Sequence, residues 1–149
     1  MYAFFVGKMP EIWETEEDKK LSVIALKKKY IAFARSKFID DPPKRILNKD
    51  TGWLIEISNR VINEWWGKSR TRERILAIQI LDVMLVGAKL IETVTDNKNT
   101  PGIENVSYFS NSCRINGKFF MVKITVKKML GKNRRYAYYY AAVNIEGQK

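Results

Sequence analysis

Alternation of apolar and polar residues is clearest between Phe119 and Lys127, where the chain runs FFMVKITVK. The even positions are all apolar, whereas Lys123, Thr125 and Lys127 stand at odd positions. Period-two alternation with β-branched and aromatic residues predicts a half-buried strand. We expect the even face to pack on the core and the odd face to meet water or a ligand.

The pair Asn116-Gly117, just before this strand, is a strong signal for a two-residue hairpin turn. It predicts antiparallel pairing of residues 107–115 with residues 118–127. In this register, Tyr108 lies opposite Thr125 and Ser110 lies opposite Lys123. Arg114 falls on the same face as these residues, because alternate side chains of a strand share a face.

A third strand is predicted over Arg134 to Ile145, after a looser turn at 130–133. Centring that turn on Gly131-Lys132 fixes how the tyrosines of the third strand pair. The predicted pairs are Tyr136 with Lys127, Tyr138 with Thr125 and Tyr140 with Lys123. A slip of one residue would move the tyrosines to the other face.

The first part of the chain shows mainly helical spacing of apolar residues. A helix is predicted from its cap at Thr15 to about Phe38, and Pro42-Pro43 prevents its continuation. The other predicted elements are a turn at 48–52, a strand at 53–58 and helices at 58–66 and 70–92.

Together these elements predict a single α+β domain over residues 1–149. Helices are expected to pack on one face of a curved four-stranded antiparallel sheet. The predicted parts are an N-terminal extension at 1–14, a mainly helical region with one strand at 15–92, and an antiparallel meander at 103–146. Within the extension, Tyr2 to Val6 is expected to form an edge strand or a hydrophobic staple.

Lysine and arginine outnumber acidic residues by 27 to 16, which gives a formal charge of +11 and a pI near 9.8. This charge favours a nucleic acid or an anionic membrane surface as partner; the plainer alternative is a basic protein that is merely soluble. The longest apolar stretch, Ile75 to Ile91, is interrupted by Gln79, Asp82 and Lys89, which argues against a membrane span. The N-terminus lacks the basic region of a signal peptide, so we expect a cytoplasmic location.

The chain contains no histidine and a single cysteine, Cys113. Histidine-based catalysis, Ser-His triads and most zinc sites are therefore excluded, and so is an intrachain disulfide. Any catalysis would have to use Lys, Arg, Tyr, Asp, Glu, Ser or Thr, and neither a metal nor a cofactor is expected.

A sheet face that mixes cations with tyrosines suits RNA, because Lys and Arg neutralise phosphates and Tyr stacks on unpaired bases. Alternatively, the tyrosines are ordinary strand residues, since tyrosine favours strands. The basic run Lys68 to Arg72 could hold an anion, although Arg72 and Arg74 are expected to be solvated. The predicted nucleic-acid ligands are Arg60, Lys68, Arg70, Tyr108, Arg114, Arg134, Tyr136 and Tyr140.

Three features carry a resemblance to a known family: the segment NKDTGWLIEISNR at Asn48 to Arg60, the long helix, and the hairpin block that ends in VKITVK before a tyrosine-rich strand. The chain resembles phage and polymorphic-toxin nucleases of the barnase/EndoU/colicin/RelE-like superfamily and, more narrowly, domains of large phage polyvalent proteins. Asn48, Thr51, Ser58 and Arg60 match the family's N-terminal motif. Turn and capping chemistry accounts for Asn48 and Ser58, whereas Arg60 is a candidate phosphate contact.

The resemblance implies metal-independent cleavage of RNA, often tRNA or ribosome-bound RNA, by attack of the ribose 2′-hydroxyl to leave a cyclic phosphate. The implied catalytic residues are Lys123, Thr125, Lys127 and Tyr138. The two lysines lie about 13 Å apart along a strand, so they cannot both contact one phosphate. One would stabilise the scissile phosphate, with Thr125 as a further ligand; the other would act as the base and Tyr138 as the acid.

Two other functions fit the same sequence. One is an RNA- or DNA-binding domain that uses this sheet face without chemistry. The other is a structural or interaction domain that dimerises through Tyr2 to Val6. RNA, with tRNA as one candidate, is the expected partner; an antitoxin or immunity protein is a further candidate partner, and no membrane is expected.

Overall fold

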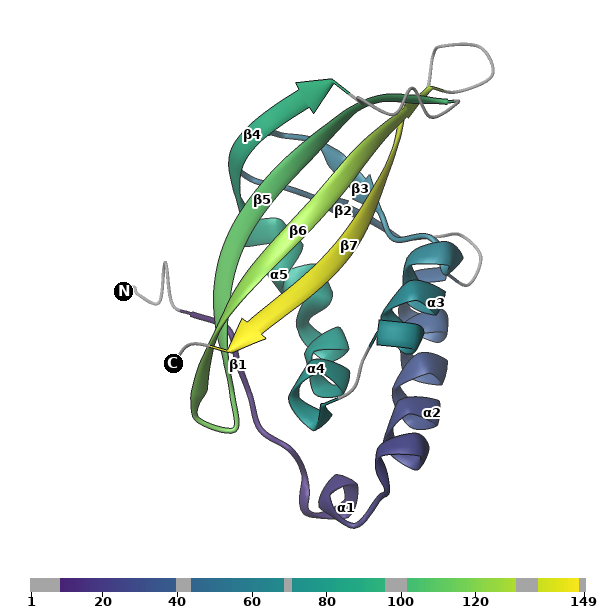
Figure 1. The fold of residues 1–149 in the computed structure, drawn as a ribbon, viewed down its shortest axis with the longest axis vertical. Helices are drawn as coiled ribbons and strands as arrows, with labels where there is room; N and C mark the ends of the chain where they lie inside the picture. Colours follow the sequence, from purple (N-terminus) through teal and green to yellow (C-terminus); the bar gives the residue numbers. More distant parts are fainter. Residues whose placement is uncertain (1–8, 40–43, 69–70, 96–101, 131–136, 148–149) are drawn as a thin grey trace.

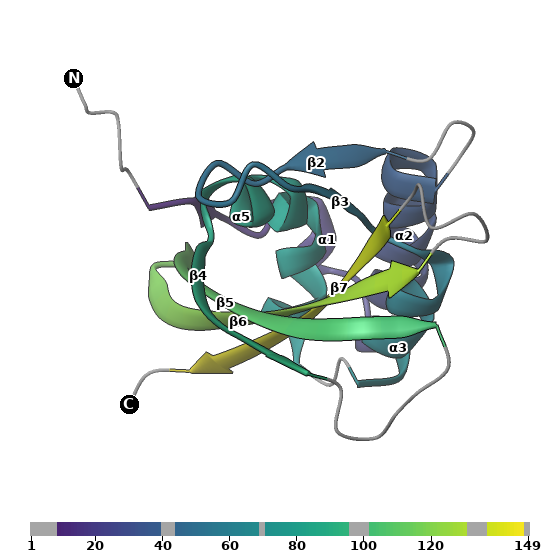
Figure 2. The same ribbon diagram turned by 90° about the horizontal axis from the view of Figure 1, so that it is seen from above.

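The computed structural model describes residues 9–39, 44–68, 71–95, 102–130 and 137–147. The fold is α+β, as predicted: the helices and a short two-stranded sheet lie on one side of a larger, curved sheet (Figures 1 and 2). None of the helices in these ranges is long and apolar enough to cross a membrane. The predicted strand or staple at 2–6 lies outside the described residues.

The larger sheet has the order β1–β5–β6–β7, and β4 also pairs with β5. Strands β4 (Lys89–Thr95), β5 (Ile103–Ile115), β6 (Lys118–Leu130) and β7 (Ala137–Gly147) are antiparallel neighbours, while β1 (Glu11–Ile12) runs parallel to β5. The predicted meander of three strands is confirmed. The fourth antiparallel strand is β4, whose residues 89–92 were predicted to belong to the helix over 70–92.

A separate two-stranded sheet pairs β2 (Arg45–Leu47) with β3 (Leu54–Glu56). The predicted turn at 48–52 joins these strands, and Gly52 adopts a φ of +76°, which glycine tolerates. The region 15–92 therefore contributes to three strands rather than to the one predicted.

The predicted helix over 15–38 is divided into two α-helices, and a π-helical turn (Arg35–Ile39) continues the second one to the predicted end near Phe38. Helix α1 (Glu16–Lys19) begins at its predicted cap, and α2 (Val23–Ala34) begins anew at Ser22. The Ser22 Oγ accepts a hydrogen bond of 3.1 Å from the backbone nitrogen of Ala25. Ser22 is thus a second N-cap, which the apolar spacing alone did not indicate.

Asp18 is fully buried at the break between α1 and α2. Its carboxylate accepts hydrogen bonds from the Lys29 ammonium and the Tyr30 hydroxyl. Burial raises the pKa of Asp18, but these two partners outweigh burial and hold it below its ordinary value of 3.8. The fold therefore favours the charged carboxylate.

We expect Asp18→Asn to lower the free energy of unfolding by about 1–3 kcal/mol at pH 7, because Lys29 loses a charged acceptor. Since the pKa of Asp18 is lower in the folded chain, its contribution is present above pH 3.8 and is lost as the pH falls further. Urea titrations at neutral and acidic pH check this. A difference between the two proteins that does not shrink in acid would contradict it.

The predicted helix over 70–92 is shorter than expected and is interrupted. Helix α4 (Arg72–Leu76), a 3-10 turn (Ala77–Ile80) and α5 (Leu81–Gly87) follow one another before β4 begins. The short helix predicted at 58–66 is confirmed as α3 (Asn59–Lys68). The Ser58 hydroxyl caps α3 by accepting a hydrogen bond from Val61, as its capping role predicted.

The buried amide of Asn48 explains where α5 ends. Its Nδ2 donates to the carbonyl oxygens of Leu85 (2.8 Å) and Ala88 (2.9 Å), and its Oδ1 accepts from the backbone and hydroxyl of Thr51. The first two bonds satisfy carbonyls that a helix end leaves unpaired, and the other two close the turn. The structural interpretation of Asn48 is confirmed.

The core lies between the helical layer and the large sheet. Val122, Ile124 and Val126, three of the four even positions between Phe119 and Lys127, are each 1% exposed, and the fourth, Phe120, is partly buried against the core. Their prediction as core residues is confirmed. Both layers contribute the largest fully buried side chains: Leu26, Phe38, Ile55, Ile57, Ile62, Ile75, Leu76, Leu85, Phe109, Ile115, Val122 and Ile124.

Candidate nucleic-acid interface

The β5–β6 hairpin has the predicted register. Tyr108 lies opposite Thr125, and Ser110 lies opposite Lys123. The turn residues Asn116 and Gly117 have φ values of 53° and 80°, as a type I′ turn requires. The Asn-Gly signal therefore located both the turn and the pairing.

The large sheet has one covered face and one exposed face. Phe109 and Cys113 are buried on the covered face, and burial raises the pKa of the Cys113 thiol to about 11, which disfavours the reactive thiolate. We call the opposite surface the open face. Its described side chains are Glu11, Lys89, Glu92, Val94, Val106, Tyr108, Ser110, Ser112, Arg114, Phe119, Met121, Lys123, Thr125 and Lys127.

The register of β6 with β7 differs from the prediction by four residues. The observed partners are Tyr140 for Lys127, Ala142 for Thr125, Asn144 for Lys123 and Met129 for Tyr138. The last paired residues, Leu130 and Ala137, show that the connection is longer than the two-residue turn on which the prediction rested. The predicted partners of Lys127 (Tyr136), Thr125 (Tyr138) and Lys123 (Tyr140) are therefore all wrong.

A shift by an even number of residues leaves each residue of β7 on the face of the sheet that was predicted for it. Tyr138 and Tyr140 consequently occupy ladder positions in the rows of the open face. Tyr138, however, lies four positions from the residue opposite Thr125, or about 13 Å along the strand. The predicted catalytic group of Tyr138 and Thr125 is not assembled, and Tyr140 takes the position beside Lys127.

Strand β4 adds residues to the open face that the sequence pattern missed. Lys89 lies opposite Ser110 and Glu92 opposite Tyr108, and the irregularity between Leu90 and Glu92 leaves Ile91 65% exposed. The β-branched residues of LIETVT were the available signal for a strand. With β1 and β4 included, four cations (Lys89, Arg114, Lys123 and Lys127) and two acids (Glu11 and Glu92) line the described open face.

Trp13 is a second feature that sequence reasoning missed. Its side chain is 62% exposed, and its Nε1 donates to Glu11 at 3.2 Å. The ring lies against the hairpin turn, because a Cβ at Gly117 would come within 3.2 Å of it. Glu11 pairs with Arg114, so an exposed indole stands at the hairpin end of the sheet. The sequence feature that could have indicated an exposed Trp13 is its position as the one tryptophan in an acidic segment, EIWETEE.

Several predicted ligands lie elsewhere. Arg60 projects from α3 in the helical layer and forms an ion pair of 3.4 Å with Glu64. It is therefore not brought together with the open face. Lys68 is the last residue of α3, and Arg70, Arg134 and Tyr136 lie outside the described residues.

Arg72 is not solvated, contrary to the prediction. Its Nε donates to the Glu14 carboxylate at 2.9 Å, and its Nη1 and Nη2 donate to the carbonyl oxygens of Leu21 (2.8 Å) and Asp18 (2.6 Å). The guanidinium is used to join segments of the fold. The basic run at 68–72 therefore does not offer Arg72 to an external anion.

The described open face can supply cations, hydroxyl groups and an aromatic ring. The side chains of Lys123 and Lys127 are exposed, and Thr125 between them is half-buried. Within the ranges that the structure describes, no group of three or more His, Cys, Asp and Glu side chains could hold a metal ion. The arrangement is suited to recognition of a polyanion.

Comparison with known proteins supplies the family. No curated protein and no solved structure matches the chain. Residues 22–140, however, match the family described as large polyvalent protein-associated domain 3. The match covers most of the chain and confirms the resemblance to phage polyvalent-protein domains. The chain therefore belongs to the large polyvalent protein-associated domain 3 family.

Proposed function

We propose that the open face binds single-stranded RNA. One observation carries the proposal: the β5–β6 hairpin places Lys123 and Lys127 on the same exposed face as Arg114 and Tyr108. Lysines about 13 Å apart can contact two phosphates of one strand. Tyr108, which is 40% exposed, can stack on an unpaired base between them.

The chemistry of the face favours single strands over a duplex. Stacking on tyrosine requires a base that is not paired, and sequence-specific RNA recognition mostly targets such bases. A face of hydroxyl groups and cations also complements the ribose and phosphate of RNA. The formal charge of +11 adds attraction at long range.

Binding of a labelled oligouridine, measured by fluorescence anisotropy at several salt concentrations, tests the proposal. We expect Lys123→Ala with Lys127→Ala to weaken binding. The slope of the logarithm of the binding constant against the logarithm of the salt concentration should become less steep by roughly 1.4, or 0.7 for each phosphate that is no longer neutralised. The matched control is Lys20→Ala with Lys28→Ala, which removes the same charge from exposed positions of the helical layer. Equal effects of the two double variants would disprove a specific interface.

Substitution of Tyr108 separates stacking from charge. We expect Tyr108→Ala to weaken binding by about 1–3 kcal/mol while leaving the salt dependence unchanged, because the ring contributes no charge. Tyr108→Phe should retain binding, since it keeps the ring. Comparable losses in both variants would point to the hydroxyl group instead.

A second candidate function on the same face is metal-independent RNA cleavage. It is favoured by the register of β6 with β7, in which the partner of Lys127 is a tyrosine, Tyr140. In this reaction the 2′-oxygen attacks phosphorus, the 5′-oxygen leaves, and a cyclic phosphate forms. The 2′-proton passes to a base, for which Lys123 is the candidate, and the leaving oxygen receives a proton from an acid.

Incubation of the protein with total tRNA in chelator distinguishes the two functions. Cleavage predicts products with cyclic phosphate ends, which Lys127→Ala should abolish while the fold is retained. Intact tRNA at high protein concentration, together with salt-dependent binding, would leave the binding function alone.

A further inference from the structure

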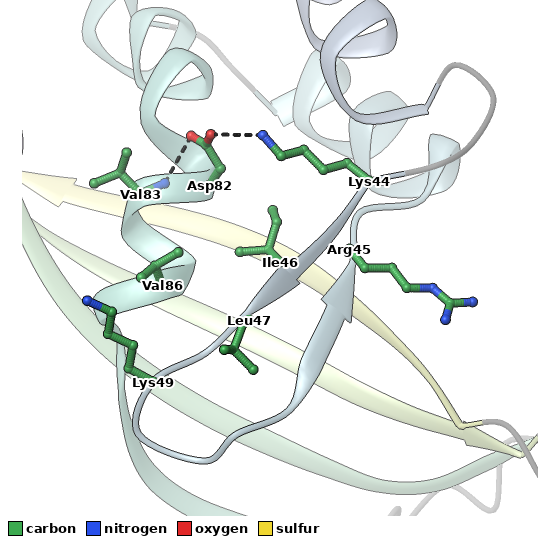
Figure 3. Close-up of a pocket in the computed structure, with 8 residues that line it drawn as sticks. All are labelled: Lys44, Arg45, Ile46, Leu47, Lys49, Asp82, Val83 and Val86. Atoms are coloured by element: carbon green, nitrogen blue, oxygen red, sulfur yellow. Dashed lines mark hydrogen bonds and ion pairs between the residues drawn. The ribbon is translucent and has the colours of Figure 1, made fainter.

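A groove lies between β2 and α5. Both elements lie on the side of the large sheet opposite the open face (Figure 2). The volume of the groove is about 330 Å³, and its walls are aliphatic: Ile46 and Leu47 come from β2, and Val83 and Val86 from α5 (Figure 3). Leu47 and Val83 are 51% and 50% exposed. Leu54, opposite Leu47 in the β2–β3 ladder, extends this apolar surface and is equally exposed.

Cations stand at both ends of the groove. Lys44 lies at one end, where it shares the Asp82 carboxylate with Lys37 at distances of 3.4 and 3.1 Å. Burial raises the pKa of Asp82, but Lys37, the backbone nitrogen of Val83 and Lys44 together outweigh burial and hold it below its ordinary value, so the charge of the acid is already compensated by its own neighbours.

At the other end, Lys49 is exposed, and its side chain makes no hydrogen bond or ion pair with any residue that the structure describes. The groove is therefore an aliphatic surface with an excess of positive charge.

We propose that this groove docks an acidic protein segment that inserts an aliphatic side chain between β2 and α5. Carboxylates on either side of that side chain would face Lys44, which precedes β2, and Lys49, which lies in the turn after it. The hydrogen bond from the Lys49 nitrogen to the Val86 oxygen (3.0 Å) fixes Lys49 relative to α5, and the Lys44 ammonium lies 3.4 Å from the carboxylate of Asp82 in α5. The aliphatic walls supply binding energy by burial, and the cations select an acidic partner.

The walls distinguish this partner from a nucleic acid. No aromatic side chain lines the groove, so it offers no platform on which a base could stack. Half-exposed leucine and valine, in contrast, gain from contact with another aliphatic side chain. A protein segment is thus the better complement, and the open face stays free for RNA.

The probe is a short synthetic peptide in which leucine is flanked by glutamate and aspartate, followed by methyl NMR of the full chain. We expect shifts concentrated at Ile46, Leu47, Val83 and Val86. A peptide with serine in place of leucine, and one with glutamine in place of the acids, should each bind roughly tenfold more weakly. Equal binding of the three peptides, or shifts centred on the open face, would overturn the proposal.

Two variants locate the interaction. Lys49→Glu should weaken peptide binding roughly tenfold, whereas Lys28→Glu, the same charge reversal on an exposed position of α2, should not. Val83→Thr keeps the volume but makes the wall polar and should weaken binding without altering the fold, because Val83 is half-exposed. If oligouridine displaces the peptide, or Lys49→Glu weakens RNA binding as strongly as it weakens peptide binding, the groove belongs to the RNA interface and the proposal fails.

Discussion

Asn48→Ala is expected to lower the free energy of unfolding by about 3–5 kcal/mol. The side chain is fully buried and makes four hydrogen bonds, two as donor and two as acceptor. Its loss leaves the carbonyls of Leu85 and Ala88 without these partners, and a buried polar group without a partner costs more than its bond contributed. The same substitution removes the two hydrogen bonds from Thr51 to the Asn48 side chain that close the turn at 48–52.

Urea unfolding followed by circular dichroism measures this cost, and hydrogen exchange shows where it falls. We expect the amides at the end of α5 and the start of β4 to exchange faster first, because the Asn48 amide holds this junction. Asn63→Ala is the matched control, since Asn63 is exposed and accepts one bond from Arg35. A cost for Asn48→Ala no larger than the control's would show that the turn does not depend on this amide.

Asn48 illustrates why part of the fold was predictable and part was not. Local signals sufficed where the determinant was local: the Asn-Gly turn set the β5–β6 register, and alternation separated the faces of β6. The end of α5 depends on a side chain about forty residues away in sequence. Apolar spacing continued past Gly87, so the pattern extended the helix into residues that form β4.

The candidate site was predictable to the same extent. Lys123, Thr125 and Lys127 share an exposed face because their parity is fixed within one strand. The partner of each on β7 depends on the length of the 131–136 connection, which has no tight-turn signal comparable to Asn116-Gly117. Arg72 could not be assigned from its helical position, because Glu14 and the carbonyls that it binds come from distant segments.

Arg72→Ala is the second substitution with a large expected effect, a loss of about 2–4 kcal/mol in the free energy of unfolding. The guanidinium binds the Glu14 carboxylate and the carbonyl oxygens of Asp18 and Leu21, and so ties α4 to the end of α1 and to the segment after β1. The Glu14 side chain is only 7% exposed. Removing Arg72 therefore leaves a buried carboxylate without this cation.

A double-mutant cycle separates the Arg72–Glu14 ion pair from the hydrogen bonds of Arg72 to the Asp18 and Leu21 carbonyl oxygens. Glu14→Gln in the Arg72→Ala background should recover part of the lost stability, because a neutral amide is less costly to bury than an unpaired carboxylate. Arg72→Lys should have a free energy of unfolding between those of Arg72→Ala and the wild type, since an ammonium cannot reproduce the planar guanidinium that reaches both Glu14 and the carbonyls. Arg35→Ala, which removes an exposed arginine with one hydrogen bond to Asn63, should cost below about 1 kcal/mol. Additive effects of Glu14→Gln and Arg72→Ala would show that the carboxylate and the guanidinium act independently. The stabilisation by Arg72 would then come from its two carbonyl contacts alone.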